Sequence, residues 1–421
     1  MLKNNALKQY IIQNLERLSI DELNSYIELS CIYTPINQAT NQLMVNSLPD
    51  LKKTTIKTLE FSSLSGSLTQ KIIKKYQNNC LRLEATILFE NQTALELSQL
   101  IFDKYFPNNT RLKVILVNAD YLNYNSEFYD IVASRPRISK VSGLIRKELC
   151  NLYDDEFACN TVSFLLHKSL NFGTSFSFLL PKYFLNNFDF SKIRDNLQKL
   201  SISHIYDFSE MAFKDTHQEF FSITLSKAKP ISQVQVTSLF SNEITNINQE
   251  FITNNCLNFW TIYSTLDFRN WLKTMNFDIF NVYRDRQLKK SDFFDIGDIK
   301  VLKAINIPRD GTEVISTEKD KYLKSDQLIG LDASKFLNKN DVYLCPNLTT
   351  KPRLILKPKS TIASGSLAIL IPKSNVALTE ADIKYFASTE FEKFYNIARN
   401  LSRRSLNIDK QSVYIFGIRK V

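Results

Sequence analysis

Several features that mark whole classes of protein are scarce or absent in this chain of 421 residues. Only eight glycines and eleven prolines occur, which excludes collagen-like and low-complexity structures. No run of about eighteen apolar residues is present, so a membrane span is not expected. The N-terminal segment MLKNNALKQYIIQNLERL has no long apolar stretch, and we do not expect it to be a signal peptide.

The six cysteines are scattered along the chain, and no two of them form a Cys-x-x-Cys pair. This spacing argues against a zinc ribbon and against a disulfide framework. Cys150 and Cys159 are the nearest pair and have no histidine between them. We predict reduced thiols in a protein of the cytoplasm, with no metal site.

The charge balance is basic, with 53 lysines and arginines against 43 acidic residues, a formal charge of +10. This excess favours a polyanionic partner such as nucleic acid, although a lysine-rich composition can produce the same value. Hydrophobic residues make up 44% and charged residues 23%, which is typical of a folded protein. The length exceeds one core of ordinary size, so two domains are expected.

Strand and helix patterns alternate over the first half of the chain, after two short amphipathic helices within residues 3–29 and a helix starting near Pro35. Such alternation predicts a doubly wound sheet with a nucleotide-type site at its carboxyl edge. The expected strands are 56–61, 83–89, 114–118, 129–133, 175–181, 202–207 and 220–225, and the expected helices are 68–77, 93–106, 155–170 and 193–200.

The alternation stops after Lys227, and Lys229-Pro230 is interpreted as a boundary. Residues 230–295 are aromatic-rich and are predicted to form a helical connector. Short strands, turns and lysines follow, up to a final helix around 379–402. The predicted organisation is N-terminal helices at 1–30, an α/β domain at 31–229, the connector at 230–295 and an α+β domain at 296–421.

Side chains suited to a nucleotide-like cofactor occur in order along the α/β part. IYTP at 32–35 begins a helix, and LEFSSLSGSL at 59–68 places an acidic residue and a glycine turn between a strand and a helix. Glu90 ends the second strand, and Asp120 follows the third. Each feature also has a plain interpretation as a helix entry, a turn or a solvated carboxylate. Their combined order and spacing is more specific than any one of them.

This order resembles the N6-adenine DNA methyltransferases of the gamma arrangement, from restriction-modification systems, well over residues 30–225 and loosely beyond. The resemblance implies a doubly wound, Rossmann-like methyltransferase sheet, a C-terminal α+β target-recognition domain and S-adenosylmethionine as cofactor. The strand–helix segments FGTSFSFLLPKYFLNN and IRDNLQKLSISHIYDF are similar to units of the family's scaffold. The cofactor-binding residues that it implies are Tyr33, Thr34, Pro35, Glu60, Gly66, Glu90 and Asp120.

The cofactor loop departs from the family's pattern at two positions. Phe61 stands in place of a proline, and Leu64 stands in place of the first glycine. Glycine lets the backbone turn tightly against a cofactor, whereas leucine disfavours a positive φ. We expect the loop to persist as a turn with weakened cofactor binding.

The segment YDIVASRPRI at 129–138 lies where the resemblance places the catalytic motif, Asp/Asn/Ser-Pro-Pro-aromatic. In the family, the polar residue accepts from the target amine and the aromatic stacks on the flipped adenine. The motif can be aligned to start at Ser134 or at Arg135, and both alignments lack the aromatic. Arginine also has no hydrogen-bond acceptor. The predicted motif residues are Ser134 and Pro136, in a degenerate setting with Arg135, Arg137 and Ile138.

Basic residues recur in the C-terminal part, along alternating strands and beside the final helix. Side chains of this kind contact DNA phosphates, and a few read base edges. The alternative is a solvated basic surface. The predicted DNA-binding residues are Lys351, Arg353, Lys357, Arg399, Arg403 and Arg404.

Three functional hypotheses follow. The first is a DNA-binding, catalytically impaired methyltransferase-like subunit that recognises double-stranded DNA for an active methyltransferase partner. The second is an active adenine-N6 methyltransferase with divergent loops, and the third is a non-catalytic recognition subunit of a restriction system.

Overall fold

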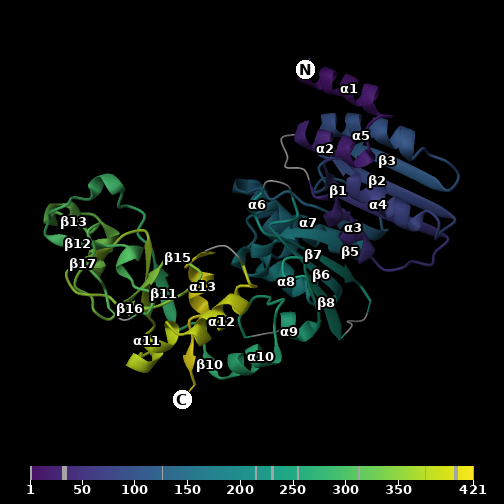
Figure 1. The fold of residues 1–421 in the computed structure, drawn as a ribbon. Coiled ribbons are helices and arrows are strands. Elements are labelled where there is room, and N and C mark those ends of the chain that lie inside the picture. Colours follow the sequence, from purple (N-terminus) through teal and green to yellow (C-terminus); the bar gives the residue numbers. More distant parts are fainter. Residues whose placement is uncertain are drawn as a thin grey trace. The chain divides into compact units, whose positions relative to one another are not determined.

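The computed structural model of the protein describes residues 2–30, 36–125, 127–213, 216–228, 232–253, 256–311, 313–374, 376–402 and 406–420. The chain divides into two compact units, Met1–Thr253 (unit 1) and Asn254–Val421 (unit 2). Figure 1 shows the fold of each unit.

Unit 1 is built on a nine-stranded sheet with the order β3-β2-β1-β4-β5-β7-β6-β8-β9. Its strands are β1 (Thr55–Ser63), β2 (Arg82–Phe89), β3 (Leu112–Asn118), β4 (Tyr129–Ser134), β5 (Gly173–Pro181), β6 (Ser201–Ser209), β7 (Phe220–Ser226), β8 (Gln233–Ser238) and β9 (Glu243–Asn248).

The first five strands are mutually parallel, whereas β7 runs antiparallel to both β5 and β6. The order along the sheet reverses between β1 and β4, which are direct neighbours and pair Phe61 with Ser134. In an open α/β sheet, a ligand binds at the carboxyl ends of the strands at such a reversal point. The loops after β1 and β4 therefore form the edge at which a site is expected.

The helices of unit 1 are connected in alternation with the strands. They are α1 (Leu2–Asn14), α2 (Ile20–Ser30), α3 (Gln38–Asn46), α4 (Ser67–Tyr76), α5 (Gln92–Tyr105), α6 (Gly143–Tyr153), α7 (Thr161–Phe172), α8 (Ser191–Leu197) and α9 (Gln249–Thr253).

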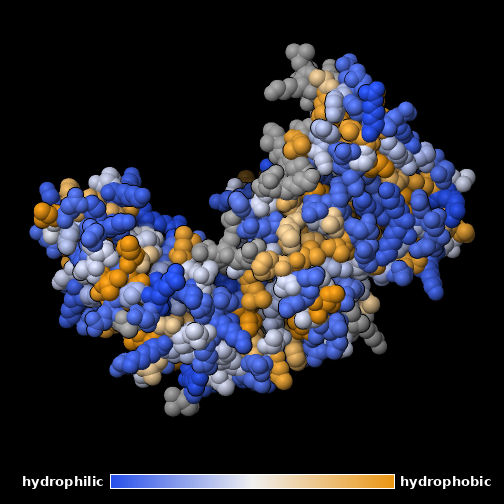
Figure 2. Space-filling model, in the orientation of Figure 1, coloured by the Kyte–Doolittle hydropathy of each residue, from blue (hydrophilic) through white to orange (hydrophobic). Residues whose placement is uncertain are grey.

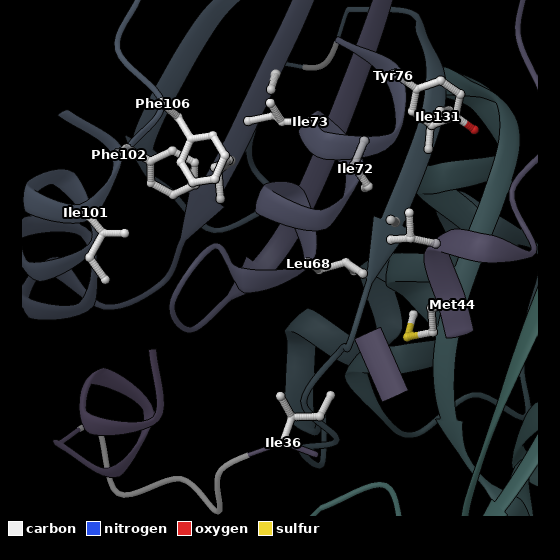
Figure 3. Packing of buried hydrophobic residues seen from close by; sticks show 14 of the residues in the cluster. Ile36, Met44, Leu68, Ile72, Ile73, Tyr76, Ile101, Phe102, Phe106 and Ile131 are labelled. Atoms are coloured by element: carbon white, nitrogen blue, oxygen red, sulfur yellow. The ribbon is translucent and has the colours of Figure 1, made fainter. Parts of the chain in front are cut away.

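One hydrophobic cluster joins α3, α4 and α5 to the sheet (Figure 3). Leu68, Ile72 and Ile73 of α4 are fully buried, and on α5 the ring centroid of Phe102 lies 5.5 Å from that of Phe106. Ile131 of β4 belongs to the same cluster. Full burial of such a side chain contributes about 1.5–3 kcal/mol, so this packing fixes α4 firmly against the sheet.

The predicted Rossmann-like fold class is confirmed, because helices connect β1 to β2, β2 to β3, β4 to β5 and β5 to β6, with the reversal described above. The helical connector predicted for residues 230–295 is wrong. Residues 233–248 instead form the hairpin β8–β9, which extends the sheet. Val234 and Val236 alternate with polar residues and bury one face, which stabilises a strand rather than a helix.

Unit 2 contains a four-stranded sheet, β11-β18-β14-β16, a three-stranded sheet, β13-β12-β17, and two short strand pairs, β10–β20 and β15–β19. The strands are β10 (Met275–Asn276), β11 (Phe280–Tyr283), β12 (Ile299–Leu302), β13 (Lys321–Leu323), β14 (Tyr343–Pro346), β15 (Leu348–Thr349), β16 (Ile355–Leu356), β17 (Thr361–Ala363), β18 (Leu367–Pro372), β19 (Leu406–Asn407) and β20 (Ile418–Arg419).

The helices of unit 2 are α10 (Leu266–Lys273), α11 (Glu380–Phe386), α12 (Thr389–Ala398) and α13 (Lys410–Tyr414). The single helix predicted around 379–402 is two helices, because Thr379 and Ser388 each cap a new N-terminus. Phe386, Phe391 and Phe394 from these helices are fully buried in the aromatic core of the unit.

Candidate functional site

The loops after β1 and β4 bring three charged side chains together at the reversal point of the sheet. Arg135 follows β4, Glu60 lies on β1, and Glu28 reaches in from α2. The Arg135 side chain is 4% exposed and each glutamate side chain is 1% exposed. These three side chains thus form a buried cluster of ionisable groups.

Arg135 is the centre of this cluster. Its Nη1 lies 3.3 Å from Oε1 of Glu28, and its Nη2 lies 3.2 Å from Oγ of Ser67, the first residue of α4. The same Nη2 is 3.9 Å from Oε1 of Glu60. The guanidinium plane therefore connects α2, β1 and the N-terminus of α4.

The carboxylate of Glu60 is bound to the first turn of α4. Its Oε2 accepts from the backbone N–H of Thr69 at 2.8 Å and from the Thr69 hydroxyl at 2.7 Å. Its Oε1 accepts from the Ser63 hydroxyl at 2.7 Å, and Ser63 Oγ accepts from the N–H of Gly66. A carboxylate is stabilised at a helix N-terminus by the orientation of the peptide dipoles. Glu60 therefore serves the protein's own helix.

Glu28 was not among the predicted site residues. Its Oε1 accepts from the Ser65 hydroxyl at 2.8 Å, and its Oε2 accepts from the backbone N–H of Ile36 at 3.0 Å. One feature of the sequence could have indicated its burial, because Glu28 directly follows the apolar Ile27 on an amphipathic helix. Its partner Arg135 is far along the chain, so the pairing could not be predicted.

Gly66 has the positive φ expected of the cofactor loop, +69°, and caps α4. A Cβ at this position would lie 2.5 Å from Cε2 of Phe102, so the absence of a side chain serves the packing of α5 on α4. Phe61, which replaces the family's proline, is buried and stacks on Tyr121 with ring centroids 4.3 Å apart. The loop persists as a turn, as predicted, and is filled with protein side chains.

The segment predicted to hold the catalytic motif is also tied into the scaffold. Ser134 is fully buried, and its hydroxyl donates to the backbone carbonyl of Phe61 on the neighbouring strand at 2.8 Å. Pro136 is buried as well, whereas Arg137 is exposed and Ile138 is half-buried. The Ser134 hydroxyl, which the resemblance aligns with the acceptor of the target amine, thus faces the adjacent strand β1.

Glu90 and Asp120 lie at the same edge of the sheet, at the carboxyl ends of β2 and β3. Both are exposed. Glu90 Oε1 accepts from the Ser62 hydroxyl at 2.8 Å. Asp120 accepts from the N–H of Leu122 and from the Asn123 side chain within its own turn. Tyr33, Thr34 and Pro35 lie outside the described residues.

The residues at the reversal point do not fit S-adenosylmethionine. A ligand at such a point uses the free N–H groups of the helix N-terminus and a glycine loop. Here Glu60 binds the first turn of α4, Arg135 contacts Ser67, and Phe61 stacks on Tyr121.

A pocket of about 280 Å³ opens beside the loop after β4. Pro136 and Ile138 line it together with Phe213 and Phe220, whose ring centroids are 4.8 Å apart in an edge-to-face arrangement. The sequence motif lacks an aromatic after the proline, but the fold supplies two aromatic rings, Phe213 from the segment after β6 and Phe220 from the start of β7. Phe213 and Phe220 are far from the motif along the chain, so the sequence alone could not place them beside it.

The predicted DNA-binding residues of unit 2 differ in exposure. Lys357 is 1% exposed and donates to the carbonyls of Leu337 and Pro358. Arg353 donates to the carbonyls of Pro308 and Ile307. Lys357 is not in a position to contact a phosphate, because its ammonium already satisfies buried carbonyl groups, whereas Arg353 is half-buried. The sequence pattern could not separate these lysines and arginines from surface ones.

The other predicted DNA-binding residues are placed as follows. Lys351 is half exposed and lies 3.2 Å from a carboxylate oxygen of Glu392. Arg399 is 9% exposed at the end of α12. Arg403 and Arg404 lie outside the described residues. The face of the molecule in Figure 2 is largely hydrophilic, with scattered hydrophobic residues on both units.

Within the described ranges, none of the helices has the length and apolar character needed to cross a membrane. In the same part of the chain, no three His, Cys, Asp or Glu side chains are grouped so as to hold a metal ion.

The solved structures to which the chain is similar are methyltransferases and restriction-modification proteins. One is assigned as a class I S-adenosylmethionine-dependent methyltransferase from Listeria monocytogenes, with 16% identity and a TM-score of 0.43 over 53% of this chain and 75% of that one. Another is the type I restriction-modification methyltransferase subunit from Streptococcus thermophilus, with 18% identity and a TM-score of 0.40 over 51% and 50%.

A third is the type IIG restriction endonuclease BpuSI, with 12% identity and a TM-score of 0.48 over 91% of this chain and 58% of that one. The chain thus spans between half and three quarters of these structures. No protein-family model matches the sequence, and no curated protein matches it.

Proposed function

We propose that the protein is a methyltransferase-like DNA-recognition subunit that does not transfer methyl groups itself. In this proposal it binds double-stranded DNA and works with an active adenine-N6 methyltransferase in a modification system.

The observation that carries the proposal is the placement of Ser134. Methyl transfer to an amine needs an acceptor that faces the target, and the Ser134 hydroxyl is fully buried and donates to the Phe61 carbonyl. Arg135, the alternative first residue of the motif, has no acceptor and is paired with Glu28. The loop therefore lacks the chemistry that the reaction requires.

The DNA-binding part of the proposal is supported by the formal charge of +10. Lys351 is the most exposed cation among the predicted residues that the structure describes. Arg403 and Arg404 complete the proposed phosphate contacts.

The decisive assay is transfer of a labelled methyl group to adenine-containing duplexes. The purified chain should incorporate no label alone, and adding it to a co-encoded methyltransferase should raise incorporation by that enzyme. The proposal fails if the chain alone methylates DNA, and loss of that activity in Ser134→Ala would then identify Ser134 as the acceptor. Ser177→Ala is the matched control, because Ser177 is a buried strand serine whose hydroxyl also donates to a backbone carbonyl.

An active adenine-N6 methyltransferase with divergent loops is the second candidate. The observation in its favour is the pocket between the loop after β4 and the aromatic pair Phe213 and Phe220. Stacking on an aromatic ring stabilises an extruded base by about 1–3 kcal/mol. Micromolar binding of S-adenosylmethionine in a calorimetric titration would favour this candidate over the first.

A further inference from the structure

We propose that Arg135 acts as an internal ligand, whose guanidinium occupies a cation site formed by Glu28, Glu60 and Ser67 and holds α2 and the N-terminus of α4 together at the reversal point of the sheet. The proposal concerns the folded state of unit 1. It is independent of DNA recognition and of any partner.

The site is complementary to a guanidinium group rather than to any cation. Nη1 and Nη2 of Arg135 are directed to different elements, the first to Glu28 on α2 and the second to Ser67 at the start of α4. A planar fork with several donors can bind both at once, whereas the ammonium group of lysine is a single point charge. Ser67 Oγ in turn accepts from the side chain of Asn41.

The charges explain why the site must be filled. Glu28 and Glu60 are both buried, and one guanidinium lies between them. A buried charge that loses its partner is strongly destabilising. The hydroxyl groups of Ser63, Ser65 and Thr69 and the first turn of α4 offset part of that cost, so the two carboxylates form a lasting cation site.

A consequence is that unit 1 holds this edge of its sheet in place without any bound small molecule. The cation that organises the N-terminus of α4 comes from the chain itself, on the residue directly after β4. Removing only the arginine side chain should leave a cavity shaped for free guanidinium.

The test is chemical rescue of Arg135→Ala in the full chain. Thermal unfolding is followed by far-UV circular dichroism with about 50 mM guanidinium chloride, a concentration far below the molar range that unfolds proteins. We expect the substitution to lower the midpoint by on the order of 10 °C, since a broken buried pair is costly. Guanidinium should recover part of this loss, and equal sodium chloride or urea should not.

Arg137→Ala is the matched control, because Arg137 is the exposed arginine of the same loop. It should lower the midpoint much less and show no guanidinium-specific recovery. The proposal is overturned if Arg135→Ala is as stable as the parent chain, or if guanidinium and sodium chloride act alike on it.

Should Arg135→Ala not fold, Arg135→Lys keeps the charge and serves as the second variant. It should fold with a lowered midpoint, because lysine cannot contact Glu28 and Ser67 together. An unchanged midpoint for Arg135→Lys would show that any cation suffices and would refute a site specific for guanidinium.

Discussion

Replacing Gly66 by alanine tests whether this residue of the expected cofactor loop is needed for packing. Two costs add at this position. The φ of +69° disfavours a side chain by about 1–2 kcal/mol. The new Cβ would lie 2.5 Å from Cε2 of Phe102, and forcing an extra carbon into a packed core costs about 1–3 kcal/mol. We expect Gly66→Ala to lose about 2–5 kcal/mol of unfolding free energy.

Gly143 provides a matched control for the backbone contribution. Its φ is +66°, and no atom lies within 4 Å of an added Cβ. Gly143→Ala should therefore lose only about 1–2 kcal/mol. The difference between the two variants isolates the contact with Phe102.

Urea unfolding followed by far-UV circular dichroism measures both variants. Both tryptophans, Trp260 and Trp271, lie in unit 2, so tryptophan fluorescence reports on a part of the chain that neither substitution touches. The double variant Gly66→Ala/Phe102→Leu relieves the clash. Its loss of unfolding free energy should therefore be smaller than the sum of the losses of the two single variants. Equal losses for Gly66→Ala and Gly143→Ala would refute the packing role.

Two further predictions concern the basic residues of unit 2. Burial lowers the pKa of Lys357 from 10.5 to about 8. Between pH 8 and pH 10.5 the unfolded chain therefore binds more protons than the folded chain, and the free energy of unfolding rises with pH. In urea unfolding followed by tryptophan fluorescence, this rise should be present in the parent chain and missing in Lys357→Met; an identical pH dependence in the two would contradict the burial argument. Each phosphate contact contributes about 0.9 to the slope of log affinity against log salt, so Arg403→Ala/Arg404→Ala should flatten the slope for duplex DNA by about 1.8. Lys357→Met should leave that slope unchanged, because the Lys357 ammonium is bound to carbonyl groups of the protein. An unchanged slope in Arg403→Ala/Arg404→Ala would exclude those two arginines as phosphate contacts.

The strands β1 to β7 could be predicted because each is a short, largely apolar run bounded by turn residues, and most lie next to segments with helical periodicity. The hairpin β8–β9 was missed although Val234 and Val236 alternate with glutamines, because the aromatic residues that follow favoured a helical connector. Thr379 and Ser388 show how local capping divides a long hydrophobic pattern into two helices.

The chemistry of the site was only partly predictable. The loop after β4 was located from sequence, and the cationic character of that loop was recognised. The pairing of Arg135 with Glu28 was not predicted, because Glu28 lies on a helix that no sequence motif connects with Arg135. Likewise, the burial of Lys357 depends on carbonyl groups of Leu337 and Pro358 whose positions exist only in the folded chain.

The pair of Arg135 and Glu28 also restricts which sequences can be reached from this one by single substitutions. Changing Arg135 toward a methyltransferase-like residue first leaves two buried carboxylates without their cation, and changing Glu28 first removes the partner of a buried guanidinium. Each single step passes through a less stable protein, so the two changes depend on one another. Exchanging either residue would thus require a compensating change elsewhere, and selection for stability alone tends to preserve the buried pair.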